Sequence, residues 1–205
     1  MEYPTALIEN AVNEISKLPG IGKKSAIRVI LKLLKERPEY TETLSEALLK
    51  LRHETKYCRI CHMINDTEEC TCITPNKDTS VICVVEDTPD IMAIQHTAQY
   101  NGLFHVLGGL ISPIDGIGPD DLNIQSLVDR IQNSEYEVKE IILALSTNME
   151  GDTTAFYLAK KLKQFNLKIT TIARGVPIGG ELEFADDITL GRSIVKRIMY
   201  DVNQD

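Results

Sequence analysis

The sequence contains no run of about 20 apolar residues, the length that a membrane-spanning helix needs. Its first residues, Met1-Glu2-Tyr3-Pro4, do not show the basic-then-apolar pattern of a signal peptide. Internal repeats and low-complexity segments are also missing. We therefore expect a cytoplasmic protein with no membrane association.

The chain also lacks an overall excess of positive charge. Its 22 Lys and Arg residues are outnumbered by 30 Asp and Glu residues, which gives a formal net charge of −8. This balance excludes a protein whose whole surface is basic. The charges are uneven, however, because residues 1–57 carry ten basic and eight acidic side chains, whereas the remainder carries twelve basic and twenty-two acidic ones. We therefore expect a polyanion to bind the N-terminal part.

The length and the apolar content set the scale of the fold. With 205 residues, of which 43% are hydrophobic, the chain has enough apolar material for one full core and one smaller module. In its second half, short apolar runs alternate with amphipathic stretches, which is typical of an α/β fold with a parallel sheet covered by helices. The predicted strands are 81–85, 103–107, 141–145 and 169–173, the crossover helices are 89–99, 122–131 and 153–165, and a C-terminal helix covers about 193–200.

The N-terminal part is predicted to form a small unit of three helices. The first covers 5–17 and ends at the turn Leu18-Pro19-Gly20-Ile21-Gly22. The second begins directly after this turn and ends at Pro38. A capping box of Thr43 and Glu46 marks the third, whose predicted buried stripe consists of Leu44, Leu48 and Leu51.

The turn between the first two helices has the form of a helix-hairpin-helix. Gly20 and Gly22 let backbone N–H groups approach a phosphate, and the second helix offers its positive end there. Lys23, Lys24 and Arg28 add positive side chains, with Lys32 and Lys35 further along. Contacts of this kind hold the DNA backbone and read no sequence. The alternative is an ordinary Pro-Gly turn with solvated lysines.

Four of the five cysteines lie within fifteen residues. Their order, Cys58-x-x-Cys61 followed by Cys70-x-Cys72, favours two short turns around one tetrahedral zinc ion with four thiolate ligands. Such a site has no open position for chemistry, so we interpret it as structural. Four unmetallated cysteines are the alternative, and His62 is poorly placed to replace a thiolate. Cys83 lies in an apolar run and is predicted to be a buried strand thiol.

Acidic residues follow two of the predicted strands. Glu86 and Asp87 come after the first strand, and Glu150 and Asp152 come after the third, so both pairs lie at the carboxyl edge of the sheet. Clustered carboxylates at this edge are able to bind Mg²⁺ for phosphoryl transfer, or to form a solvated rim that docks a partner. The sequence offers no nucleophile beside a general base in this region.

Several of these blocks, in this order along the chain, resemble the RecR family of bacterial recombination mediators. The resemblance runs almost from end to end. It covers the hairpin and the cysteine segment described above, together with Ile82-Cys-Val-Val-Glu86, His105-Val-Leu-Gly-Gly109, Ser112-Pro-Ile-Asp-Gly-Ile-Gly-Pro119, Glu150-Gly-Asp152 and Gly175-Val-Pro-Ile-Gly-Gly-Glu-Leu-Glu-Phe-Ala-Asp186.

The resemblance implies a helix-hairpin-helix, a four-cysteine zinc element, a Toprim domain and a C-terminal segment with a Walker-like character. It places Lys24 and Arg28 at DNA-contacting positions, and Glu86, Glu150 and Asp152 at acidic Toprim positions tied to RecO binding. Asp152 stands where the family usually has Glu. The single residue between Cys70 and Cys72 is one fewer than usual, which leaves the detailed zinc geometry open.

The function implied by the resemblance is that of a non-catalytic scaffold. A homotetrameric ring would encircle DNA and act with RecO and RecF to load a recombinase onto gapped DNA or onto single strands covered by single-strand-binding protein. The cell compartment would be the bacterial cytoplasm, at the nucleoid during repair. The alternative is a Mg²⁺-dependent Toprim enzyme that acts on nucleic acid.

The same resemblance suggests four divisions of the chain. Residues 1–56 would form the helix-hairpin-helix region, 57–79 the zinc finger, 80–175 the Toprim domain, and 176–205 the C-terminal segment with its helix. The glycines of 175–180 are compatible with phosphate binding, but the segment has no Gly-Lys-Ser/Thr ending. A loop used for packing or subunit contact is the other interpretation.

Overall fold

The computed structural model describes residues 3–176, 179 and 181–197, and the chain divides into two compact units, Met1–Thr55 and Lys56–Asp205. Each unit has its own core and is described by itself. None of the described helices is both long and apolar enough to cross a membrane.

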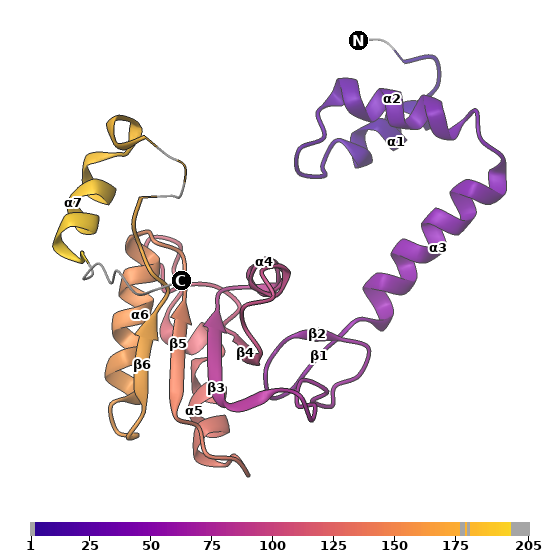
Figure 1. Cartoon of the computed structure of the whole chain (residues 1–205). Coiled ribbons are helices and arrows are strands. Elements are labelled where there is room, and N and C mark those ends of the chain that lie inside the picture. The colour runs from indigo at the N-terminus through magenta and orange to yellow at the C-terminus, as the bar shows by residue number, and fades with distance from the viewer. Residues whose placement is uncertain (1–2, 177–178, 180, 198–205) are drawn as a thin grey trace. The chain divides into compact units, whose positions relative to one another are not determined.

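The N-terminal unit is built from α1 (Ala6–Ile15), α2 (Lys23–Leu33) and α3 (Pro38–Glu54) (Figure 1). α1 is capped by Thr5, whose side chain accepts a hydrogen bond from the Ile8 amide. α1 and α2 pack against each other through a small core of Val12, Ala26 and Ile30. The two predicted helices and the turn between them are thus present.

The third helix differs from its prediction. Pro38 does not end α2, which stops at Leu33, but begins α3, where its missing N–H group leaves no hydrogen bond unmade. Thr43 lies inside the helix and bonds the Glu39 carbonyl, so it does not cap. α3 buries none of its residues within the chain, and the predicted buried stripe is exposed: Leu44 by 42%, Leu48 by 58% and Leu51 by 64%.

The C-terminal unit opens with a short antiparallel hairpin of β1 (Lys56–Tyr57) and β2 (Ile64–Asn65). His62, with a φ of 59°, supplies the left-handed residue that turns the chain between them. Two strands of two residues each are too short to be stable alone. The stability of this hairpin therefore depends on other contacts. The cysteines next to its strands in the sequence are in a position to make them.

A four-stranded parallel sheet forms the centre of this unit (Figure 1). Its strands are β3 (Asp78–Val85), β4 (Gly102–Val106), β5 (Glu140–Ala144) and β6 (Lys168–Thr171), in the order β4-β3-β5-β6. All four predicted strands are confirmed to within a few residues. The crossover helices are α4 (Thr88–His96), α5 (Ile124–Gln132) and α6 (Met149–Leu162), and a short helical turn, η1 (Pro119–Asp121), precedes α5.

Alternating strand residues divide the core between the two faces of the sheet. Ile82, Val84 and Leu103 pack into the larger cluster with α5 and α6, and the intervening Cys83 and Phe104 pack into a smaller cluster with α4. Helices therefore cover both faces, as the alternating pattern of the sequence predicts. This arrangement leaves the carboxyl ends of β3 and β5 side by side at one edge.

The C-terminal helix was predicted in the wrong place. After a short turn, η2 (Leu182–Phe184), helix α7 runs over Asp187–Val195 and so begins six residues before the predicted start of 193. Its start is fixed by Asp186, whose carboxylate accepts from the Thr189 amide at 2.8 Å. The end of the prediction, residues 198–200, lies outside the described residues, as does part of the 175–180 glycine segment.

Candidate functional site

The hairpin between α1 and α2 presents an uncapped helix start to solvent. Gly20 has a φ of 77°, which only glycine adopts without strain, and it turns the chain toward Gly22, the residue before α2. Because Gly22 has no side chain, no side-chain cap covers the first N–H groups of α2. The helix therefore begins with exposed donors at its positive end, which suits an anion such as a phosphate.

Positive side chains surround this helix start. Lys23 and Lys24 occupy the first turn of α2, which contains no acidic residue, and Arg28 follows one turn after Lys24. All three are exposed, because Ala26 and Ile30 take the buried side of the helix. Lys32, further along α2, is paired with Glu36 at 2.5 Å. Lys23, Lys24 and Arg28, which form no ion pair with a described residue, thus make a basic surface at the hairpin.

Three cysteines of the C-terminal unit lie close enough to share one metal ion. The sulfurs of Cys58, Cys61 and Cys70 are within 4.8 Å of one another. Around zinc, at Zn–S distances of about 2.3 Å, tetrahedral sulfurs lie roughly 3.8 Å apart, so the three fit such an ion. Cys72 is outside this group, although its sulfur lies 2.8 Å from that of Cys70.

The local backbone supports thiolates at these positions. The Cys58 sulfur accepts hydrogen bonds from the amides of Ile60, at 3.4 Å, and Cys61, at 3.5 Å. The pKa of the Cys72 thiol is lowered, first by the hydrogen bond from the Cys61 thiol and further by Cys70 and the positive charge of Arg130. Thiolates are thus favoured at Cys58 and Cys72, whereas the hydrogen bond with Cys72 raises the pKa of Cys61 and burial raises the pKa of Cys70 to about 12.

Cys83 and His62 are both separate from this cluster. Cys83 is 2% exposed in the middle of β3, where burial raises the pKa of its thiol to about 12, so the prediction of a buried strand thiol is confirmed. The His62 ring bonds the Ser126 hydroxyl at 2.7 Å and packs edge-on against His105. It fastens the cysteine segment to α5.

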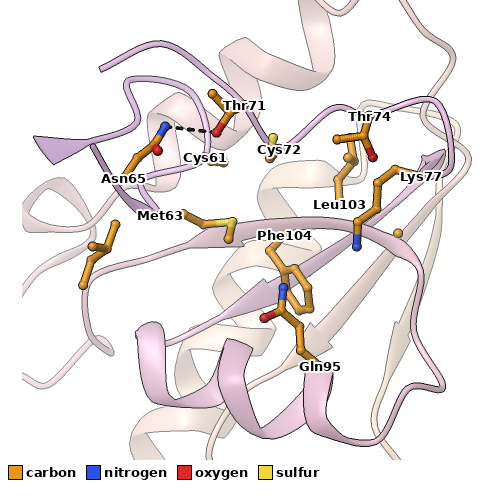
Figure 2. Close-up of a pocket in the computed structure, with 12 residues that line it drawn as sticks. Cys61, Met63, Asn65, Thr71, Cys72, Thr74, Lys77, Gln95, Leu103 and Phe104 are labelled. Atoms are coloured by element: carbon orange, nitrogen blue, oxygen red, sulfur yellow. Dashed lines mark hydrogen bonds between the residues drawn. The ribbon is translucent and has the colours of Figure 1, made fainter. Parts of the chain in front are cut away.

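A cavity of about 220 Å³ lies between the cysteine segment and the sheet. Figure 2 shows Cys61 and Cys72 at its wall, with Met63 beside them and Leu103 and Phe104 of β4 opposite. The hydrogen bond from Asn65 to Thr71, 3.1 Å long, closes a loop that contains Cys70 and ends directly before Cys72. The cysteine segment is therefore packed onto the sheet domain.

The acidic residues predicted at the carboxyl edge have different surroundings. Glu86 accepts a hydrogen bond from the Ser146 hydroxyl at 2.8 Å, across the ends of β3 and β5. Asp87 caps α4 in a reciprocal capping box with Asp90. Glu150 lies in the first turn of α6 and forms no ion pair with any described residue.

Asp152, by contrast, is held by two arginines from the end of the chain. Arg174, which follows β6, bonds one carboxylate oxygen, and Arg192 of α7 approaches the other at 3.4 Å. The hydrogen bond from Arg174 lowers the pKa of Asp152. Among the described residues these carboxylates do not come within 4.8 Å of one another as a group of three, so no ready-made Mg²⁺ cage is present.

Three arginines near these sites are absent from the sequence prediction. Arg174 and Arg192 neutralise Asp152, and Arg130 of α5 lies beside Cys72 with only 6% of its surface exposed. A signal existed for Arg174, because it directly follows a predicted strand at the acidic edge of the sheet. For Arg130, its position three residues after the buried Leu127 on the same helix was the available sign.

Comparison with known proteins shows the family to which this arrangement belongs. Residues 8–52 match a family model described as RecR, helix-hairpin-helix, residues 80–173 match the Toprim domain, and residues 175–198 match RecR, C-terminal. A protein of Amoebophilus asiaticus called Recombination protein RecR is 57% identical over 201 residues, which cover 98% of this chain and all of that protein. Proteins of the same name from Cytophaga hutchinsonii and Bacteroides thetaiotaomicron are each 54% identical, covering 100% and 97% of both chains, respectively.

Proposed function

The chain belongs to the RecR family, and we propose that it is a DNA-binding recombination mediator that works as an oligomeric scaffold rather than as an enzyme. The observation that carries this proposal is the uncapped start of α2. Exposed backbone donors after Gly20 and Gly22 lie beside Lys23, Lys24 and Arg28, so a phosphate backbone would meet donors and positive charge together. The contacts would be independent of sequence, as a mediator of general repair requires.

The pairing of Asp152 supports a scaffold over an enzyme. A carboxylate that binds Mg²⁺ for phosphoryl transfer has to be free to coordinate the ion, whereas Asp152 already balances Arg174 and Arg192. Glu86 and Glu150, which have no ion pairs in the described chain, remain available to a basic partner. We propose RecO as that partner at the edge formed by Glu86, Asp87, Glu150 and Asp152.

One structural zinc ion per chain belongs to the same proposal. Cys58, Cys61, Cys70 and Cys72 would hold it, and the ion would supply the cross-link that the short β1–β2 hairpin cannot provide by itself. Four protein ligands leave no position for a substrate, so the ion would take no part in chemistry. Its contribution would be to stabilise the cysteine segment, which connects the helix-hairpin-helix to the four-stranded sheet along the sequence.

The remaining features of the proposal follow from the family. We propose a tetrameric ring in the cytoplasm that acts with RecO and RecF to load a recombinase onto gapped or protein-covered single strands. We also propose the divisions 1–56, 57–79, 80–175 and 176–205 as the functional parts of the chain. The alternative, a Mg²⁺-dependent Toprim enzyme, is favoured only by Glu86 and Glu150 lying at the same edge of the sheet.

One set of DNA-binding titrations at several salt concentrations tests this proposal. Lys24→Ala combined with Arg28→Ala should weaken binding and make the dependence of log K on log salt less steep by about 2 units, because each lost phosphate contact removes about 0.9. A matched control is Lys160→Ala with Lys163→Ala, which removes the same charge from exposed positions of the C-terminal unit and should bind as the wild type does.

The same samples, incubated with Mg²⁺ on single-stranded, gapped and supercoiled DNA, decide between scaffold and enzyme. The DNA should remain intact and unextended. Unchanged salt dependence in the hairpin variant would remove the hairpin from the DNA site. Mg²⁺-dependent processing by the wild type that disappears in Glu86→Gln would establish the enzyme instead.

A further inference from the structure

Arg130 is a buried cation with no carboxylate partner among the described residues. Its guanidinium donates from Nη1 to the Phe104 carbonyl oxygen at 2.8 Å and from Nε to the Tyr136 hydroxyl at 3.2 Å. Both acceptors are neutral. Within the part of the chain that the structure describes, Arg130 forms no ion pair with Asp or Glu. Because a guanidinium stays charged when buried, it needs an anion close by.

Among the hydrogen-bond partners of Arg130 in the described chain, Cys72 of the cysteine cluster is able to supply that anion. Nη2 of Arg130 donates to the Cys72 sulfur at 3.8 Å. The two rings nearby, His62 and His105, cannot serve, because an imidazole is either neutral or positively charged. A zinc ion with four thiolates carries two net negative charges, so the cluster with its ion would balance the guanidinium.

The spacing of the cysteines explains why Cys72 would depend on this side chain. The Cys58 sulfur receives two backbone N–H donors from its own turn, at Ile60 and Cys61. The turn of Cys70 and Cys72 is one residue shorter, and no backbone N–H of the described residues donates to the Cys72 sulfur. The Arg130 side chain takes the place of that missing donor.

We propose that Arg130 is a positioning residue of the metal centre, which holds Cys72 as the fourth thiolate and balances the charge of the cluster from outside the ligand set. This inference rests on the zinc site of the proposed function and adds a residue from a different element. Arg130 also joins the cysteine segment to β4 through Phe104 and to the loop after α5 through Tyr136. Metal binding and the packing of the segment on the sheet are thereby coupled.

Zinc affinity of the full-length chain, measured by competition with a chromophoric chelator, tests the role of Arg130. Arg130→Met keeps much of the volume and removes the charge and the donors, and it should weaken zinc binding about 10- to 100-fold. Arg130→Lys keeps the charge and should weaken it less. Arg59→Met is the matched control, because Arg59 lies in the same segment but is exposed and paired with Glu68, and its zinc affinity should stay within about twofold of the wild type.

Replacement of zinc by Co²⁺ gives a second measurement that a purely structural role would not change. The thiolate-to-cobalt charge-transfer band should be weaker in Arg130→Met than in the wild type, because one thiolate is lost or loosened, and far-UV circular dichroism checks that the variant is folded. If Arg130→Met fails to fold, the test is made with Arg130→Lys instead. Loss of zinc from Arg130→Lys as complete as the loss from Cys58→Ser would overturn the role of the charge.

The failure of this inference differs from the failure of the zinc site itself. Wild-type zinc affinity in Arg130→Met, with a wild-type cobalt spectrum, overturns the role of Arg130 and leaves the site standing. Equal losses in the Met and Lys variants also overturn it, because charge would then not matter. Wild-type protein that contains no zinc as purified overturns the metal site and, with it, this inference.

Discussion

Gly151 is the residue that lets α6 begin against the end of β5. A Cβ atom added there would lie 1.9 Å from the Ser146 carbonyl oxygen and 3.1 Å from the Asn148 side chain. The obstacle is backbone, which cannot move aside as a flexible side chain does. This close approach puts Glu150 and Asp152, on either side of the glycine, at the sheet edge, and the same Ser146 donates its hydroxyl to Glu86.

Gly151→Ala should therefore lower the free energy of unfolding by about 1–3 kcal/mol or more, because the added methyl group overpacks a fixed backbone contact. Gly191→Ala is the matched control, since Gly191 also lies in a helix but has nothing within 4 Å of the added Cβ. That variant should be neutral or stabilising by up to about 1 kcal/mol. Urea denaturation measures both, and equal stabilities of the two variants would contradict the close contact at Gly151.

At single positions, the sequence identified residues by chemical type but not by their partners. The hairpin glycines, the basic side chains of α2 and a cluster of four cysteines, of which the structure groups three, were predictable because each motif is local in the chain. The contacts of Asp152 with Arg174 and Arg192, and of Cys72 with Arg130, join residues 22, 40 and 58 positions apart. Separations of this kind depend on the tertiary fold, so no spacing rule predicts them.

Among the elements, the cysteine segment is the one least able to fold by its own packing. Its two strands have two residues each, and Tyr57 and Ile64 are exposed by 61% and 48%. The apolar surface it buries is therefore small, and the proposed metal ligation would be the larger source of stability. Removal of zinc should unfold this segment while the four-stranded sheet, with its own core on both faces, persists.

Elemental analysis should find one zinc per chain in protein purified without chelator. Cys83→Ser should retain it, because Cys83 lies in β3 outside the cluster, and Cys58→Ser should lose it. In the zinc-free protein, limited proteolysis should cut first within the segment that contains the four cysteines. Zinc loss in the Cys83 variant, or proteolysis that begins elsewhere after chelation, would show that the ion is bound in another way.

Helices and strands were predictable from the sequence where their apolar side chains are buried in the core of one unit. Runs such as 81–85 and 141–145 became strands because buried parallel strands are continuously apolar. The third helix, α3, is present as predicted, but its predicted buried stripe was wrong, since its leucines follow a helical pattern and are nevertheless exposed. α7 failed because the Asp186 cap starts it, and Gly191 lies within the helix instead of before it.

At the scale of the whole molecule, the apolar side chains that stay exposed on α3 and near α7 support the proposed oligomer. Leu48 and Leu51 of α3 are more than half exposed, as are Phe184, at 79%, and Ile188, at 70%, near α7. Apolar surface of this extent on two elements is typical of contacts between subunits. It supports the proposal of a tetramer, in which these side chains would meet copies of themselves.

Light scattering should therefore give a mass about four times the 22.9 kDa of one chain. Added RecO should increase that mass, because Glu86 and Glu150 offer unpaired negative charge to a basic partner. Glu86→Gln with Glu150→Gln should keep the tetramer and fail to take up RecO. Asp152 is left unchanged in this variant, since removing its charge would also release Arg174 and Arg192.

The control for this measurement removes the same charge elsewhere on the C-terminal unit. Glu135→Gln with Glu137→Gln changes two exposed carboxylates that precede β5, at the opposite end of the strand from Glu86 and Glu150, and should bind RecO as the wild type does. Loss of RecO in both double variants would indicate general attraction by an acidic surface and not docking at one edge. A wild-type mass of one chain would refute the ring, because a monomer cannot encircle DNA and would leave the apolar faces of α3 and α7 without the contact that explains them.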